Sequence, residues 1–187
     1  SFLRSQISPH FMFNVLNSVV SLSRRKPEMV EPVVVKLSEL MRYMIYETND
    51  SIVPILKELT YLESYIDLQK IRFGDDIRID FTHEIGPKSS SIEPMLLIPF
   101  VENAFKHGVG FIENPTIEIE LKDSAKELTF HVANKKGAVI NEKKDESSGI
   151  GLANVKRRLE LLYPTNHELT VTETDSDFEI TLTIQHI

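Results

Sequence analysis

A histidine near the start of the sequence lies on a polar stripe of an expected helix. At about 100° per residue, one stripe gathers the side chains of Gln6, His10, Asn14, Asn17 and Ser21. A neutral imidazole nitrogen on an exposed helix face can attack phosphorus, so His10 is a candidate nucleophile. Asn14 lies one turn further along and could hydrogen-bond the ring or a phosphate. The alternatives are a bundle histidine satisfied by a carbonyl group and an asparagine that is simply solvated.

Two further groups of residues could bind a phosphorylated ligand. Asn103, Lys106 and His107 fall within one turn of a second expected helix and can face a common ligand, although an ordinary solvated face would give the same pattern. Gly149 and Gly151 precede a third expected helix. Such glycines let backbone amides and the positive end of a helix approach phosphates, but they also serve as loop hinges and helix starts.

The residues before Asp50 predict a helical hairpin. A helix is expected from Phe2 to about Arg25, Pro27 marks a break, and a second helix follows. The second helix carries an apolar seam at spacings of four and three, formed by Val30, Val34, Leu37, Met41 and Met44. A lone hairpin cannot cover so much apolar surface, so we expect two copies to form a homodimeric four-helix bundle. The alternative is that both helices pack on the rest of the chain.

The turn-like residues between Thr48 and Pro54 predict a domain boundary, with the hairpin domain in residues 1–50 and a second domain in residues 51–187. The helices expected in the second domain are Pro54 to Phe73, Glu93 to His107 and Gly151 to Tyr163. The expected strands are Ile77 to Phe81, Thr116 to Lys122, Glu127 to Ala133, Glu168 to Glu173 and Phe178 to Gln185. The polar stretch from Lys135 to Ser148 is expected to be a mobile loop. The fold class is therefore α+β, a sandwich with a largely antiparallel sheet on one side and helices on the other.

Composition limits the classes of function and location. The net charge of -7 argues against a nucleic-acid surface, because phosphate backbones require clustered Lys and Arg. The absence of cysteine excludes a disulfide framework and a thiolate-ligated metal site, and it fits a cytoplasmic location. No apolar run is long enough to cross a bilayer, so we expect no membrane contact in this fragment. Ser1 runs straight into a helical pattern, which suggests a missing N-terminal sensor or membrane region.

Three segments together resemble the histidine kinases of the LytS/YehU type. They are Gln6 to Asn14 (QISPHFMFN), Pro99 to His107 (PFVENAFKH) and Gly149 to Val155 (GIGLANV), which follow in this order across nearly the whole chain. The resemblance implies a dimerisation and phosphoacceptor hairpin followed by an ATPase domain of the Bergerat (GHKL) fold.

The resemblance also implies roles for individual residues. His10 would be the phosphoacceptor, Asn103 would supply its side-chain oxygen to Mg2+, and Lys106 and His107 would approach the phosphates of ATP. A glycine box close to the nucleotide would comprise Gly149, Gly151, Leu152 and Asn154. The polar loop before this box would act as the ATP lid.

Two positions depart from the family pattern. Many other histidine kinases have an acidic residue directly after the histidine, whereas this chain has Phe11, so the sequence does not identify the group that orients or deprotonates His10. Relatives often use an aspartate to accept a hydrogen bond from the adenine amino group, and this chain has Asn134 at that position. An amide oxygen can accept the same bond without the charge, and Thr181 could share the task. The alternative for Asn134 is a turn residue that closes a strand.

The resemblance therefore implies an ATP-dependent protein-histidine autokinase of a two-component system. The γ-phosphoryl group of ATP would pass to His10 and then to an aspartate on the receiver domain of a response regulator. One alternative is a nucleotide-binding regulator of the same fold without autophosphorylation. Another is a serine kinase of the anti-sigma-factor kind, and the presence of His10 in a helical hairpin speaks against it.

Overall fold

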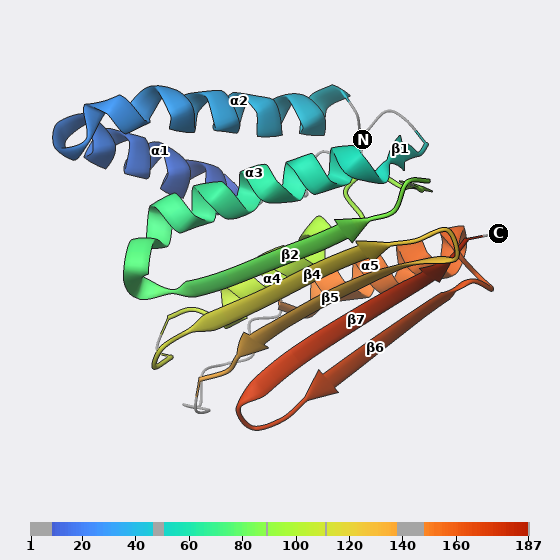
Figure 1. Cartoon of the computed structure of the whole chain (residues 1–187). Coiled ribbons are helices and arrows are strands. Elements are labelled where there is room, and N and C mark those ends of the chain that lie inside the picture. The colour runs from blue at the N-terminus through green and yellow to red at the C-terminus, as the bar shows by residue number, and fades with distance from the viewer. Residues whose placement is uncertain (1–8, 47–50, 89, 111, 138–147, 187) are drawn as a thin grey trace. The chain divides into compact units, whose positions relative to one another are not determined.

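The structure is a computed structural model that describes residues 9–46, 51–88, 90–110, 112–137 and 148–186. The chain divides into two compact units, which are described one at a time (Figure 1). Unit 1 comprises residues 1–75 and 91–95, and unit 2 comprises residues 76–90 and 96–187. The contacts therefore divide the chain near residue 75, whereas the domain boundary predicted after residue 50 stays a prediction and lies at the edge of the described residues.

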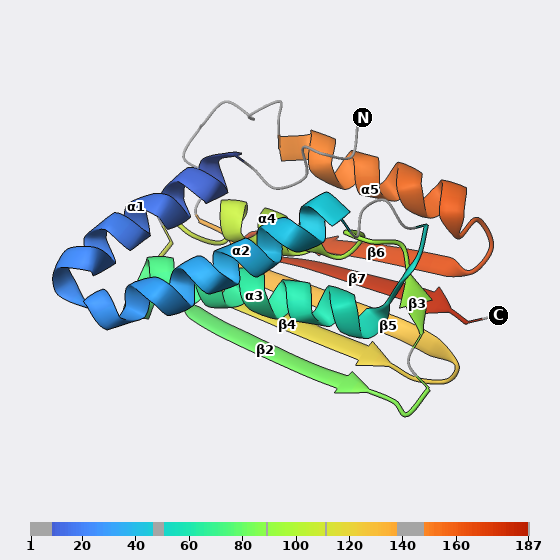
Figure 2. The same ribbon diagram turned by 90° about the horizontal axis from the view of Figure 1, so that it is seen from above.

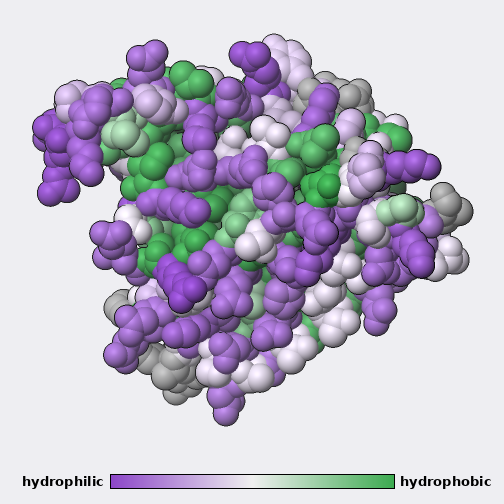
Figure 3. All heavy atoms as spheres, in the orientation of Figure 1, coloured by the Kyte–Doolittle hydropathy of each residue, from purple (hydrophilic) through white to green (hydrophobic). Residues whose placement is uncertain are grey.

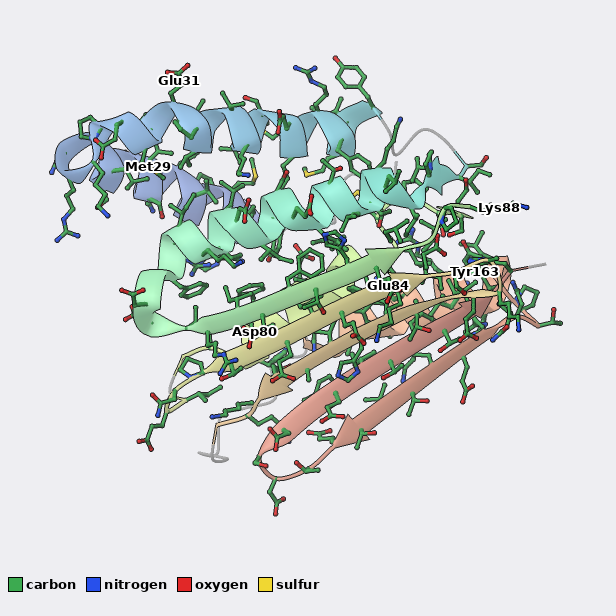
Figure 4. All side chains as sticks on the ribbon, in the orientation of Figure 1. Met29, Glu31, Asp80, Glu84, Lys88 and Tyr163 are labelled. Atoms are coloured by element: carbon green, nitrogen blue, oxygen red, sulfur yellow. The ribbon has the colours of Figure 1, made fainter. Side chains whose placement is uncertain are left out.

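Unit 1 is built on the expected helical hairpin. Helices α1 (Pro9–Arg25) and α2 (Val30–Tyr46) are joined by a 3-10 turn, η2 (Pro27–Met29), so the predicted break at Pro27 is confirmed. Met29 and Glu31 mark this end of the hairpin in Figure 4. The predicted start of the first helix at Phe2 lies outside the described residues.

A third helix, α3 (Ile55–Phe73), packs against both helices of the hairpin. The predicted boundary places this helix in the second domain, but its contacts group it with the hairpin. Before it, the short strand β1 (Val53–Pro54) pairs antiparallel with β3 (Ser91–Ile92). After it, the turn η4 (Gly74–Asp76) begins at a glycine with a φ of 55°, which favours glycine.

Aromatic and carboxylate contacts attach α3 to the hairpin. Phe11 of α1 stacks on Tyr65 with ring centroids 4.6 Å apart, and Tyr43 of α2 stacks on Tyr61 at 4.7 Å. The carboxylate of Glu58 is fully buried and accepts hydrogen bonds from the Tyr43 hydroxyl at 2.5 Å and from the Met95 amide at 2.6 Å. Through these contacts α3 covers part of the apolar surface of the hairpin, and the rest of that surface stays exposed to solvent.

Unit 2 is a five-stranded sheet with helices α4 (Ile98–His107) and α5 (Ser148–Leu162) packed on it (Figures 1 and 2). The strands are β2 (Arg78–Ile85), β4 (Thr116–Asp123), β5 (Glu127–Lys135), β6 (His167–Glu173) and β7 (Asp177–Gln185). Their order is β2-β4-β5-β7-β6, and only the β2–β4 pair among the described strands of this sheet is parallel. The α+β class and the largely antiparallel sheet are therefore confirmed.

The buried face of the sheet shows the expected alternation. Every second residue of β5 is buried, and the ring of Phe130 lies 6.2 Å from that of Phe100 on α4. The apolar residues buried on the three central strands are Ile117, Ile119, Leu121, Leu128, Phe130, Val132, Ile180, Leu182 and Ile184. Within the ranges that the structure describes, no helix is both long enough and apolar enough to cross a membrane.

Three predicted element boundaries differ from the structure by three residues or more. Strand β2 continues beyond Phe81 to Ile85 because it pairs with β4 along its whole length. Helix α4 begins at Ile98 rather than Glu93, since Met95 takes a positive φ of 58° that a right-handed helix does not allow. Helix α5 begins at Ser148, before the expected start at Gly151, and it ends just before Tyr163, which Figure 4 labels.

Candidate functional site

His10 lies exposed in the first described turn of α1. The amide nitrogen of Asn14, four residues further along, lies 3.1 Å from His10 Nδ1. In this orientation of the amide, Asn14 Nδ2 donates to an unprotonated Nδ1 of His10, and the ring proton is on Nε2. If the amide turns over, its oxygen accepts a proton from Nδ1 and the Nε2 lone pair becomes available. The orientation of the Asn14 amide therefore determines which ring nitrogen carries the proton and which keeps its lone pair.

Phe11, the residue next to His10, makes a different kind of contact. Its side chain is 3% exposed and stacks on Tyr65 of α3, so it carries no polar atom toward the imidazole. Among the residues that the structure describes, Asn14 is the one hydrogen-bond partner of His10. The Asn14 amide is thus placed to orient the imidazole of His10, a task for which the sequence alone identifies no group.

The hairpin leaves part of its apolar surface uncovered within unit 1, where green hydrophobic patches lie among purple hydrophilic side chains (Figure 3). The exposed apolar side chains of this surface, which we call the hairpin stripe, are Phe13, Leu16, Val20, Val34, Met41 and Ile45. The predicted seam is therefore divided. Val34 and Met41 are 43% and 39% exposed, but Leu37 is 6% exposed and belongs to the core of unit 1.

In unit 2, α4 carries the second group of candidate residues. Its apolar side chains are buried at Ile98, Phe100, Val101, Ala104 and Phe105. The other side of the helix carries Asn103, which is half-buried, and Lys106 and His107, which are exposed. Because residues three and four apart share a helix face, these three side chains lie on one side of α4. The predicted grouping can therefore face a common ligand.

Asn134 lies near the end of β5, against the end of α4. Its side chain is 4% exposed, and Nδ2 donates to the carbonyl oxygen of Lys135 at 2.9 Å, so Oδ1 is the atom that can accept from a ligand. A Cβ atom added at Gly108, the C-cap of α4, would lie 2.7 Å from Asn134 Cβ and 2.6 Å from Ala104 O. Glycine at position 108 therefore allows α4 to approach Asn134.

Gly108 was not among the predicted residues. The signal that could have found it is its place directly after His107, where helices commonly end on glycine. The contact matters because it brings Asn134 next to the turn that carries Lys106 and His107.

The suggestion that Thr181 shares the contact with adenine is wrong. Asn134 pairs with Phe178 across β5 and β7, and the side chains of such a pair lie on the same face of the sheet. Thr181 is an odd number of residues from Phe178, so its side chain lies on the opposite face. There it contacts His131, with Thr181 Oγ1 3.0 Å from His131 Nδ1.

The glycine box lies in the first turn of α5, which packs beside α4. Gly149 and Gly151 occupy this turn, where the backbone N–H groups have no partner within the helix. A Cβ atom added at Gly151 would meet nothing within 4 Å, so packing does not require glycine there. Leu152 is half-buried and Asn154 is exposed.

The described residues contain no group of three or more His, Asp or Glu side chains that could hold a metal ion. A single amide oxygen such as Asn103 Oδ1 fits Mg2+ that keeps several waters and binds mainly through substrate phosphates. Asn103 Oδ1 is therefore suited to a Mg2+ ion that is already bound to the phosphates of a nucleotide.

Residues 1–77 match the family model described as histidine kinase. The chain is 30% identical over 188 residues to Sensor protein LytS of Oceanobacillus iheyensis, which covers 92% of this chain and 32% of that protein. It is 32% identical over 130 residues to Sensor protein kinase HptS of Staphylococcus aureus, which covers 70% of this chain and 24% of that protein. The chain thus spans a third or less of the length of these relatives.

Solved structures share the fold at low sequence identity. The histidine kinase domain of the blue-light-activated kinase from Erythrobacter litoralis has a TM-score of 0.54 at 15% identity, covering 97% of this chain and 90% of that chain. The catalytic domain of histidine kinase ThkA has a TM-score of 0.54 at 17% identity, covering 73% of this chain and 98% of that chain. The helical region followed by an α/β sheet domain is thus the architecture of histidine kinase catalytic domains, and the chain belongs to the histidine kinase family as a sensor kinase of the LytS type.

Proposed function

We propose that this chain is the catalytic part of an ATP-dependent protein-histidine autokinase in two-component signalling. The γ-phosphoryl group of ATP passes to His10, and from there to an aspartate on the receiver domain of a response regulator. The observation that carries the proposal is the exposed imidazole of His10, whose Nδ1 is paired with Asn14 in a chain of the histidine kinase family.

The chemistry at His10 follows from the two ring nitrogens. With Nδ1–H donating to Asn14 Oδ1, the Nε2 lone pair attacks the γ-phosphorus of ATP, and the bond from that phosphorus to the bridging oxygen breaks. ADP leaves with the bond electrons. The phosphorylated ring then carries one proton too many, and it releases this proton to solvent because the Asn14 amide is not a base.

ATP is proposed to bind unit 2 at the polar face of α4. Asn134 Oδ1 accepts from the adenine amino group, while Lys106, His107 and the amides in the first turn of α5 bind phosphate oxygens. The remaining contacts near the nucleotide are assigned to Asn103, Gly149, Gly151, Leu152 and Asn154. Mg2+, when bound with ATP, neutralises charge on the phosphates, and Asn103 is its protein ligand.

The proposed assembly is a homodimer formed through the hairpin stripe. Six exposed apolar side chains on two adjacent helices support this, since such a surface is usually covered by a partner. A response regulator is the proposed second partner, and one structural neighbour of 13% identity and TM-score 0.51 is ThkA in complex with the response regulator TrrA. We place this part of the protein in the cytoplasm, attached to an N-terminal sensor region.

Incubation with γ-labelled ATP and Mg2+ tests the proposal. We expect acid-labile, alkali-stable label on the wild-type chain, and no label on His10→Ala, which should still bind ATP in calorimetry. His83→Ala, at an exposed histidine on β2, is the matched control and should be labelled normally. ATP binding without label on the wild type would favour a nucleotide-binding regulator. Acid-stable label that persists on His10→Ala would indicate a Ser or Thr acceptor.

A further inference from the structure

The residue after His10 is the buried anchor of its helical turn. Between His10 and Asn14, Phe11 is the side chain that is buried, at 3% exposure, whereas Met12 is half-buried and Phe13 is exposed. The next buried side chain on the same helix is Val15, a full turn further on. Among the described residues of this turn, the ring of Phe11 is therefore the buried side chain that contacts α3.

The partner of this ring is itself held in place. Tyr65 of α3 is 2% exposed, and its ring plane lies at 28° to that of Phe11 with centroids 4.6 Å apart. The Tyr65 hydroxyl accepts a hydrogen bond of 2.8 Å from Nε2 of Gln69, one turn further along α3. Because Gln69 is also buried, the stacking surface offered to Phe11 has a defined position and tilt.

The rotation of α1 follows from this contact. Neighbouring residues project from a helix about 100° apart, so a ring held against α3 at position 11 directs position 10 sideways, toward solvent. Asn14 then meets the imidazole from one turn below. A displacement of about 1 Å in a reacting group can cost about a hundredfold in rate, so the orientation of this turn matters to a nucleophile.

We propose that Phe11, stacked on Tyr65, is a positioning residue for the phosphoacceptor His10. It fixes the rotation of the first turn of α1, while Asn14 fixes the ring within that turn. The inference deepens the proposed function and rests on it. It also assigns a task to the position at which many other histidine kinases have an acidic residue.

The test uses Phe11→Ala, Tyr65→Ala and the double variant in the 187-residue chain, with autophosphorylation rates measured over a range of ATP concentrations. We expect each single variant to lower kcat by about tenfold to a hundredfold while the KM for ATP stays within about twofold. The double variant should lose no more than either single variant, because both changes remove the same contact. Tyr65→Phe keeps the ring but loses the bond from Gln69, so its kcat should lie between those of the wild type and Tyr65→Ala.

Val15→Ala is the matched control for a general loss of stability. It removes buried methyl groups from the same helix and leaves both rings of the stack in place, and rates are corrected for the folded fraction by circular dichroism. The inference is overturned if Val15→Ala lowers kcat as much as Phe11→Ala does, if the KM for ATP rises in step, or if Phe11→Ala keeps the wild-type kcat.

A second readout does not depend on kinase activity. The NMR signals of the His10 ring should show one ordered environment in the wild type and exchange broadening in Phe11→Ala, because the first turn of α1 then takes more than one orientation. A wild-type chain that is never labelled would defeat the proposed function but leave this readout intact. Unchanged ring signals in Phe11→Ala would defeat the positioning role whether or not the chain is a kinase.

Discussion

At the scale of single residues, the direction of the bond between His10 and Asn14 decides which ring nitrogen carries the proton and which keeps its lone pair for the proposed phosphotransfer. An asparagine amide can donate to Nδ1 or, turned over, accept from it, so the tautomer of the imidazole is open to either form. A carboxylate at the same place could only accept. The neutral Asn14 amide can turn over and is compatible with both tautomers of His10. A carboxylate would permit only the tautomer with the proton on Nδ1.

Substitutions at Asn14 test this reasoning. Asn14→Leu keeps the size of the side chain and removes its polar atoms, so we expect kcat for autophosphorylation to fall at least about tenfold with the KM for ATP unchanged. Asn14→Asp still accepts from Nδ1 and should retain most of the activity. Equal activity in the Leu variant and the wild type would show that the bond has no catalytic effect.

At the scale of elements, α4 ends at Gly108 and α5 has Gly151 in its first turn, and these two glycines have different surroundings. Gly108 ends α4 where a Cβ atom would collide with Asn134 and with backbone, whereas Gly151 in α5 has open space around it. The first glycine is required by packing. The second is not required by packing, and it leaves room for a ligand to approach the backbone.

Alanine at each glycine separates these two reasons. Gly108→Ala should lower both the melting temperature and the ATP affinity, because α4 and Asn134 must move apart. Gly151→Ala should keep or raise the melting temperature, since alanine favours helix, and lower only the ATP affinity. Thermal denaturation and calorimetry check both. Normal ATP affinity in Gly151→Ala would place the phosphates elsewhere.

The attachment of α3 to α2 gives a second prediction at this scale. Tyr43→Phe keeps the stack on Tyr61 and removes the hydroxyl that donates to buried Glu58, so the free energy of unfolding should fall by about 1.5–3 kcal/mol. Tyr46→Phe is the matched control, because Tyr46 is 67% exposed, and it should change nothing measurable. Urea denaturation gives both values, and equal stabilities would mean that this bond contributes nothing.

At the scale of the whole molecule, the hairpin stripe is the surface that a second copy would cover. On α2 its members Val34, Met41 and Ile45 lie within a strip about 40° wide, at heptad-like spacings. Leu37, which belongs to the predicted seam, points instead into unit 1. A charge at Leu37 would unfold the unit and would say nothing about the dimer.

Val34→Glu with Met41→Glu should therefore yield monomers that bind ATP with unchanged affinity. Arg42→Glu, at an exposed polar position of the same helix, is the control and should leave the dimer intact. Light scattering gives the mass and calorimetry the affinity. A dimer that persists in the double variant would place the interface outside the hairpin stripe.

Much of the molecule could be read from local pattern. Spacings of three and four predicted α1 and α2, alternation predicted β4 to β7, and the interval of four residues from His10 predicted the contact with Asn14. These features depend on the helical and strand periods alone, so a single sequence determines them. The motifs likewise identified the family, because the residue types and their order are properties of the sequence.

Tertiary structure determined the features that depend on contacts between segments far apart in the sequence. The register of β5 on β7 pairs Asn134 with Phe178 and so puts Thr181 on the other face. The packing of α3 on the hairpin buries Leu37, leaves Val34 and Met41 exposed, and gives Phe11 its partner Tyr65. Strand register and helix rotation arise from contacts between segments that are far apart in the sequence. A one-residue shift reverses the buried face of a strand and turns a helix by about 100°, so local periodicity could not determine which side chains are buried.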